Sequence, residues 1–207
     1  SDEGILYMPH RIEFYYYKAI SLNMLDRKME AIDAFRQGLE KCEEETSADA
    51  IATVYTGMGN IYHELGNKKE CYQAYDSALV YNPSDKETLN NYSYFLALDG
   101  KELQKALEMS QKTILEEPEN QTYLDTYAWI LFKMERYEEA RAYAEKIISL
   151  EEEISYVVLH HIGDIFAKCG DIDKAVIYWE RAKEAGDETE ILDKKIRKRR
   201  YYRGATH

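Results

Sequence analysis

Apolar residues recur three and four positions apart along most of the chain, and this spacing places them on one face of an α-helix. Two stretches show the pattern most clearly, Thr56 to Pro83 and Ile162 to Gly186. In each, a small residue is followed four positions later by an aromatic residue and three positions after that by alanine. These residues are Cys71, Tyr75 and Ala78 in the first stretch and Ala175, Trp179 and Ala182 in the second. The shared layout predicts that both stretches fold as the same helical unit.

The spacing of small residues continues between and before these stretches. The equivalent residues of the two stretches, such as Cys71 and Ala175, are 104 positions apart, close to three units of 34 with two residues added. Five units are therefore predicted, at 12–45, 52–85, 86–120, 121–154 and 156–189. We expect each to be two antiparallel helices, with the small residues at the crossing, where they allow the helix axes to approach to roughly 8–10 Å.

Turn-forming and capping residues lie at the predicted ends and starts of the helices. Gly66 and Gly170 lie where the first helix of a unit should end, and glycine readily takes the left-handed conformation found there. Ser84 with Glu87 resembles a capping box that would open the next helix.

Prolines lie near the predicted unit boundaries. Pro83 and Pro118 each lie three residues before a unit, and Pro9 lies at the same distance before the first one. Residues 1–11 therefore read as the tail of a preceding, truncated repeat, which predicts that the chain is a fragment of a longer array.

The second and fifth units carry recognisable motifs, "YTGMGNIY…A" and "LHHIGDIF…A". With conservative changes they match W-x2-L-G-x2-Y…A-x3-F…A…P, so residues 12–189 resemble the tetratricopeptide repeat (TPR) family. The first unit departs from the pattern, with Lys18 at a usually apolar position and Glu43 where proline is usual. The resemblance implies an all-α, right-handed superhelical solenoid whose first helices line a concave groove. Another class of helical repeat is the alternative.

The C-terminal end is predicted to close the stack. Ile191, Leu192 and Ile196 have helical spacing among charged residues, as expected of a capping helix at 190–200. Residues 201–207 would then form a flexible basic tail.

Charge is unevenly distributed along the chain. The formal net charge is −12, but Lys194 to Arg203 contains seven basic residues and no acidic one, which leaves −19 for the rest. An acidic body argues against a nucleic-acid-binding surface there. The three cysteines show no CxxC pattern, and no run of 18 apolar residues indicates a membrane span.

The family resemblance implies that ligand contacts come from the first helices. The predicted groove residues are Tyr16, Tyr17, Ile20, Thr56, Asn60, His63, Asn90, Asn91, Tyr94, Asp125, Thr126, Trp129, Lys133, His160, His161, Asp164 and Lys168. Aromatic rings offer contact area at low entropic cost, and asparagine amides can pair with a peptide backbone. The alternative is that several of these aromatic residues, Trp129 among them, belong to the core between repeats.

Other kinds of site find less support in the sequence. Some family members hold a terminal carboxylate with Lys and Arg around paired Asn residues, but Tyr16, Glu87 and Asn91 stand where those cations would be. His160 and Asp164 share a helix face, yet two ligands are too few for a metal site. The chain has no phosphate-binding loop, nucleophile elbow or other cofactor motif, so we predict no cofactor and no enzymatic activity.

The sequence thus predicts a non-catalytic scaffold that binds a peptide or protein segment in its groove, with no small-molecule substrate. The alternative is a regulatory or nucleic-acid- or anionic-surface-associated protein that acts through the basic C-terminal tail. Self-association through that tail, and a cytoplasmic or an exported location, are all left open.

Overall fold

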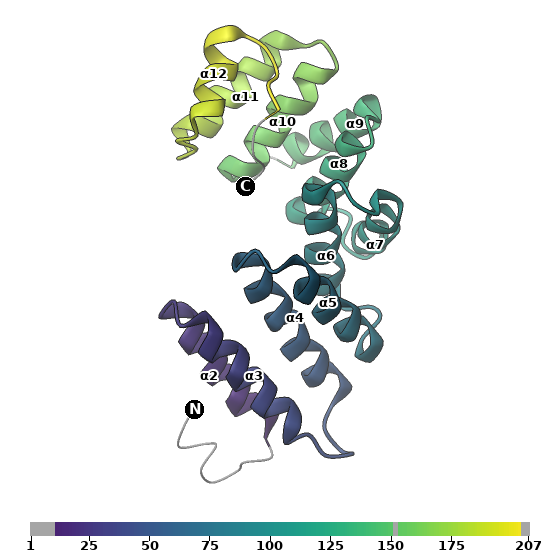
Figure 1. Ribbon diagram of the computed structural model, residues 1–207. Helices are drawn as coiled ribbons and strands as arrows, with labels where there is room; N and C mark the ends of the chain where they lie inside the picture. The colour runs from purple at the N-terminus through teal and green to yellow at the C-terminus, as the bar shows by residue number, and fades with distance from the viewer. Residues whose placement is uncertain (1–10, 151–152, 204–207) are drawn as a thin grey trace. The chain divides into compact units, whose positions relative to one another are not determined.

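The computed structural model describes residues 11–150 and 153–203, and their regular elements are all α-helices (Figure 1). The predicted all-α fold is therefore confirmed. The helices, labelled as in Figure 1, are α2 (Ile12–Met24), α3 (Lys28–Glu40), α4 (Ala48–Glu64), α5 (Lys68–Tyr81), α6 (Lys86–Asp99), α7 (Leu103–Glu116), α8 (Gln121–Lys133), α9 (Tyr137–Ser149), α10 (Tyr156–Lys168), α11 (Ile172–Glu184) and α12 (Glu190–Lys198).

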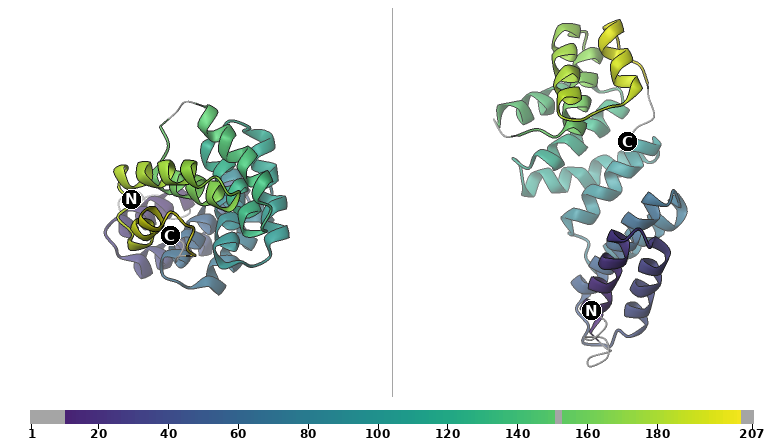
Figure 2. Two further views of the ribbon diagram at one scale, coloured as in Figure 1. Left: turned by 90° about the horizontal axis from the view of Figure 1, so that it is seen from above. Right: turned by 90° about the vertical axis from the view of Figure 1, so that its left-hand side faces the viewer.

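Successive helices of the described residues form five antiparallel pairs. The pairs are α2/α3, α4/α5, α6/α7, α8/α9 and α10/α11; one boundary differs, because α4 begins at Ala48 and the second unit was predicted to begin at 52. Helix α12 lies beside α11 at the C-terminal end, as Figures 1 and 2 show. The predicted remnant of an earlier repeat, at 1–11, lies outside the described residues except for Arg11.

The five turns inside the pairs share one geometry. In each, a backbone N–H donates to the carbonyl five residues earlier, and the residue before the donor has a positive φ. This is the Schellman ending of a helix. The positive-φ residues are Asp26, Gly66, Gly100, Glu135 and Gly170. Gly66 and Gly170 have the expected conformation, whereas Asp26 and Glu135 adopt it without being glycine.

The capping of α6 differs from the sequence expectation. The side chain of Asp85, rather than that of Ser84, accepts a hydrogen bond from the backbone N–H of Thr88 at 2.7 Å. The Thr88 hydroxyl donates to the same carboxylate oxygen at 2.6 Å. Asp85 directly precedes the first helical residue, so it occupies the position from which a side chain can reach that N–H.

Small residues lie where the paired helices cross, as predicted. A β-carbon added to Gly163 would lie 2.4 Å from Cδ1 of Trp179, and one added to Gly59 would lie 2.7 Å from Cε1 of Tyr75. These contacts bring α10 against α11 and α4 against α5. The alanines at the equivalent crossings are fully buried, namely Ala19, Ala31, Ala106, Ala128, Ala140 and Ala175.

The chain divides into two compact units, the first ending at Tyr92 and the second beginning at Ser93. The division falls inside α6, the first helix of the third repeat. Each unit has its own core of buried aliphatic and aromatic side chains. Among the described helices, none combines the length and apolar character needed to cross a bilayer.

Candidate functional site

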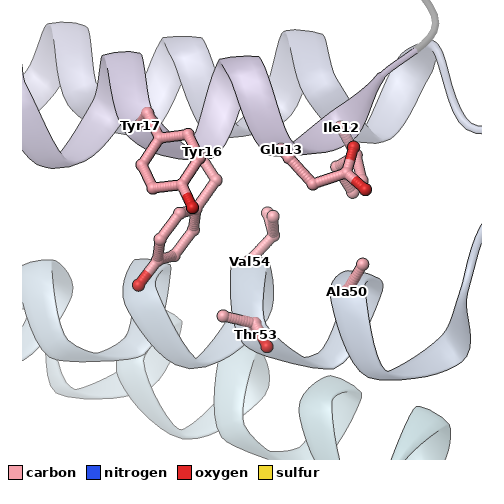
Figure 3. A pocket seen from close by; sticks show the side chains of 7 residues that line it. All are labelled: Ile12, Glu13, Tyr16, Tyr17, Ala50, Thr53 and Val54. Atoms are coloured by element: carbon pink, nitrogen blue, oxygen red, sulfur yellow. The ribbon is translucent and has the colours of Figure 1, made fainter.

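The first unit has a cavity of about 200 Å³ between its first helices, α2 and α4 (Figure 3). Tyr16 and Tyr17 extend from α2 toward α4, with their ring centroids 5.8 Å apart in an edge-to-face arrangement. The side chain of Tyr17 is 61% exposed, and that of Tyr16 is half-buried. The cavity is lined by Ile12, Glu13, Tyr16, Tyr17, Ala50, Thr53 and Val54.

An amide pair lies on the first helices of the same unit. Nδ2 of Asn91 donates to Oδ1 of Asn60 at 3.2 Å, and the hydroxyl of Tyr75 donates to the same oxygen. Both asparagines are half-buried. The hydrogen bond from Tyr75 fixes the orientation of the Asn60 amide. The two asparagines therefore present hydrogen-bonding groups in a fixed orientation.

A carboxylate lies one turn from the amide pair on α6. Glu87 lies four residues before Asn91, one turn earlier on the same side of α6. Burial raises the pKa of Tyr16, and the negative charge of Glu87 raises it further. Glu87 is exposed and forms no ion pair with any described residue. We call Tyr16, Tyr17, Asn60, Glu87 and Asn91 the first-unit face.

The remaining predicted residues of the first unit are less open. Thr56 and Asn90 are buried, and the Thr56 hydroxyl lies 2.5 Å from that of Thr88. His63 is half-buried near the end of α4, and Ile20 is half-buried on α2.

The corresponding positions of the second unit are closed by α12. Lys195 is only 2% exposed, and its Nζ donates to both carboxylate oxygens of Asp164 at 2.6 and 2.7 Å. Nζ also lies 2.7 Å from Nε2 of His160. The indole N–H of Trp179 donates to Asp164 at 3.0 Å, and Asp187 lies 2.6 Å from Nδ1 of His160. His160 and Asp164 were predicted to face a ligand, and in the structure both contact Lys195 of α12.

Helix α12 occupies the place of the first helix of a sixth repeat. The offset of 104 residues that relates the second and fifth repeats also relates Asn91 to Lys195 and Asn60 to Asp164. The ion pair at the C-terminal end thus replaces the amide pair of the first unit. Apolar burial contributes to this docking beside the ion pair, because Leu192 of α12 is fully buried and Ile191 and Ile196 are half-buried.

Residues 199–203 continue beyond α12 across the second unit. The ring of Tyr201 packs edge-on against Phe132, with centroids 5.7 Å apart, and the ammonium of Lys168 lies 5.0 Å from its centroid. Burial, followed by the charge of Asp164, raises the pKa of Tyr201 to about 12. We expected residues 201–207 to form a flexible tail; the described part, 201–203, has Tyr201 packed in this way.

The other aromatic candidates of the second unit lie between repeats. The ring of Trp129 stacks on that of His161, with centroids 3.9 Å apart, and both are buried. Asp125 fixes the His161 ring, since its carboxylate oxygens lie 2.9 and 3.1 Å from Nδ1. The half-buried ring of Tyr94 lies 6.2 Å from His161. This arrangement matches the alternative prediction that Trp129 is part of the core.

Thr126, Lys133 and Lys168 complete the predicted set. Thr126 is buried in α8. The ammonium of Lys133 lies 5.5 Å from the Trp129 ring, and burial, followed by the positive charge of Arg203, lowers the pKa of Lys133. Lys168 is exposed, and its ammonium is held over Tyr137 as well as Tyr201.

The buried network makes the stability of the second unit dependent on pH. A lysine ammonium can only donate, so Nε2 of His160 accepts and Nδ1 carries the hydrogen that bonds Asp187. Burial lowers the pKa of His160 below 6.5. The unfolded chain therefore takes up this proton at a higher pH than the folded chain. Stability is greatest above the unfolded pKa and is lost as the pH falls through the lowered folded value.

We therefore expect the urea midpoint of the second unit to decrease between about pH 7 and about pH 5. Tryptophan fluorescence can follow this midpoint, because Trp129 and Trp179 both lie in that unit. Replacing His160 by glutamine should flatten the pH dependence. If the urea midpoint changes equally with pH in wild type and H160Q, His160 is not the source of the pH dependence.

Comparison with known proteins assigns the chain to a family. The model of the tetratricopeptide repeat family matches residues 10–182. The chain belongs to the tetratricopeptide repeat family. TPR proteins are generally non-catalytic scaffolds for protein–protein interaction, which gives the chain a protein-binding role in general terms.

Solved TPR structures share the fold. Among them, pilF of Pseudomonas aeruginosa superposes with a TM-score of 0.71 at 19% identity, over 90% of this chain and 83% of that one. PilW, a type IV pilus biogenesis factor, gives a TM-score of 0.77 at 14% identity, over 91% and 85% of the two chains. YrrB, described as a TPR protein with an unusual peptide-binding site, gives 0.69 at 17% identity, over 95% and 97%. No curated protein matches the chain by sequence.

Two residues of the buried network in the second unit, Lys195 and Asp187, were not singled out from the sequence. Lys195 was counted only as one charge in a basic run, and Asp187 lies where the TPR pattern has proline. A lysine among the apolar positions of an amphipathic capping helix is the only signal that pointed to burial. Among the described residues, no group of three or more His, Cys, Asp or Glu side chains is placed to hold a metal ion.

Proposed function

We propose that the chain is a non-catalytic scaffold that binds an extended peptide segment of another protein on the first-unit face. The observation that carries this proposal is the open tyrosine-lined cavity between α2 and α4, with the Asn60–Asn91 amide pair in the same unit. The equivalent polar positions of the second unit are covered by α12.

Each part of the face suits an extended peptide. Tyr16 and Tyr17 offer rigid rings with a polar edge, so they can contact an apolar side chain and still be hydrated in the free protein. The half-buried amides of Asn60 and Asn91 can donate to and accept from a peptide backbone. The peptide-binding site named for YrrB, which has the same fold, is in keeping with such a role.

The basic C-terminal segment supports a separate role less well. Lys195 is buried, Arg199 bonds Asp173, and the ammonium of Lys194 lies 4.3 Å from the centre of the Tyr202 ring. These contacts engage three of the seven basic side chains of residues 194–203 within the protein itself.

The test is a display selection of randomised peptides on the immobilised chain. Enriched peptides should bind wild type and lose at least about tenfold in affinity when Tyr17 and Asn91 are both replaced by alanine, because this removes ring area and the backbone partner. Both side chains reach the surface, so folding should be retained, and circular dichroism checks this.

The matched control replaces Tyr81 and Gln73 by alanine. These exposed residues lie on α5, the second helix of a repeat in the same unit. If no peptide is enriched, or if both double variants bind as tightly as wild type, the first-unit face is not the binding site.

A further inference from the structure

The two units differ in whether a basic segment of the same chain packs against their net negative charge. Residues 1–92 carry 16 acidic and nine basic side chains, a formal net charge of −7. Residues 93–189 carry 21 acidic and 11 basic side chains, a net charge of −10, and residues 190–203 add +5. The second unit therefore has a basic segment of the same chain packed on it, through Lys195 and Tyr201.

The second unit also shows how such a surface holds a cation. The Lys195 ammonium donates to the Asp164 carboxylate and lies 5.2 Å from the centroid of the Tyr201 ring and 5.9 Å from that of Trp179. A carboxylate supplies charge and hydrogen-bond acceptors, and the rings supply attraction to a cation.

The first-unit face also contains tyrosine rings and a carboxylate. Glu87 is exposed, lies one turn before Asn91 on α6, and forms no ion pair with the described residues. Two other glutamates nearby are paired: Glu13 with Arg11 at 3.1 Å, and Glu64 with Lys28 at 3.3 Å. Glu87 is therefore the carboxylate on this face that an incoming cation can pair with.

We infer that the partner segment bound by the first-unit face is basic, with a lysine or arginine that pairs with Glu87. This inference rests on the proposed function and names the chemistry of its partner. An apolar or aromatic neighbour of that cation fits the cavity between α2 and α4, where Tyr17 forms the exposed wall.

The experiment uses the full chain and two synthetic peptides, with binding measured by fluorescence anisotropy. The first peptide is EILDKKIRKRRYYR, the sequence of residues 190–203, which is basic and aromatic. The second has every lysine and arginine replaced by glutamine. We expect the basic peptide to bind and the neutral peptide to bind at least about tenfold more weakly, with binding of the basic peptide weakened by salt.

Two glutamate variants test the position of the cation. Glu87→Gln should weaken binding of the basic peptide by about fivefold to tenfold, because it removes charge and keeps shape. Glu70→Gln is the matched control, since Glu70 is also an exposed glutamate in the first turn of a helix in the same unit. It should leave binding nearly unchanged.

Each other outcome overturns the inference in a recognisable way. Equal binding of the two peptides, with loss in the variant lacking Tyr17 and Asn91, would leave the proposed function standing and remove the charge preference. No peptide binding at the face, for these peptides or the randomised pool, would remove the proposed function as well. Concentration-dependent self-association of wild type that Glu87→Gln abolishes would make the occupant a second copy rather than a separate partner.

Discussion

Replacing Lys195 by alanine is expected to destabilise the second unit by about 3 kcal/mol, because the variant leaves the buried Asp164 carboxylate without its cation. The hydrogen bond to His160 is lost at the same time. Urea unfolding followed by tryptophan fluorescence measures this effect. The indole of Trp179 donates to the same carboxylate, so its emission should also change before global unfolding.

Two further variants make this test specific. Lys183→Ala breaks an exposed pair with Asp193, between α11 and α12, and should have little measurable effect. Lys195→Asn combined with Asp164→Asn recreates the amide pair of Asn91 and Asn60, and should recover part of the loss. A small effect of Lys195→Ala, or losses in the double variant that simply add, would mean that the ion pair does not hold α12.

Replacing Gly163 by alanine is expected to destabilise the second unit by about 1–3 kcal/mol, although alanine is the better helix former by about 1 kcal/mol. The new methyl group would lie 2.4 Å from Cδ1 and 2.5 Å from Nε1 of Trp179, which is fully buried. The indole must then move, and its hydrogen bond to Asp164 is strained. The sign of the effect therefore decides between packing and helix propensity. Urea unfolding followed by circular dichroism measures it.

The first repeat offers a matched rescue. Ala19 and Phe35, both fully buried, occupy the positions equivalent to Gly163 and Trp179. Gly163→Ala combined with Trp179→Phe recreates that pair and should cost less than the sum of the single changes. Stabilisation by Gly163→Ala alone would contradict the close crossing of α10 and α11.

The repeat architecture could be read from the sequence because it depends on side-chain size at a fixed spacing. Gly163 against Trp179 and Gly59 against Tyr75 need only a small residue opposite a large one. The turn at Glu135 was not foreseen, because the Schellman hydrogen bond from Arg136 to Leu131 holds a non-glycine residue at positive φ. This stabilisation comes from the hydrogen bonds of the completed turn, so the type of residue at position 135 does not reveal it.

The site was harder to predict, since helical periodicity places a residue on a face but does not say what covers that face. Trp129, His160 and Asp164 were assigned to the groove by their spacing, yet the first stacks on His161 and the other two contact Lys195. The contact between Lys195 and Asp164 joins residues 31 positions apart in the chain. In the sequence, Lys195 was visible only as part of a run of positive charge. Tyr17 lines the cavity between the adjacent first helices α2 and α4, and its part in ligand binding stays a prediction.

The central claim is that the first-unit face is the open binding face of the chain. The most direct test is an NMR titration of the isotopically labelled chain with the basic peptide EILDKKIRKRRYYR, followed through backbone amide shifts. The account predicts saturable shifts that cluster in α2, α4 and the first turns of α6, around Tyr16, Tyr17 and Asn91. Shifts confined to α8, α10 and α12 would contradict it, because they would place the peptide where Lys195 and Tyr201 already lie.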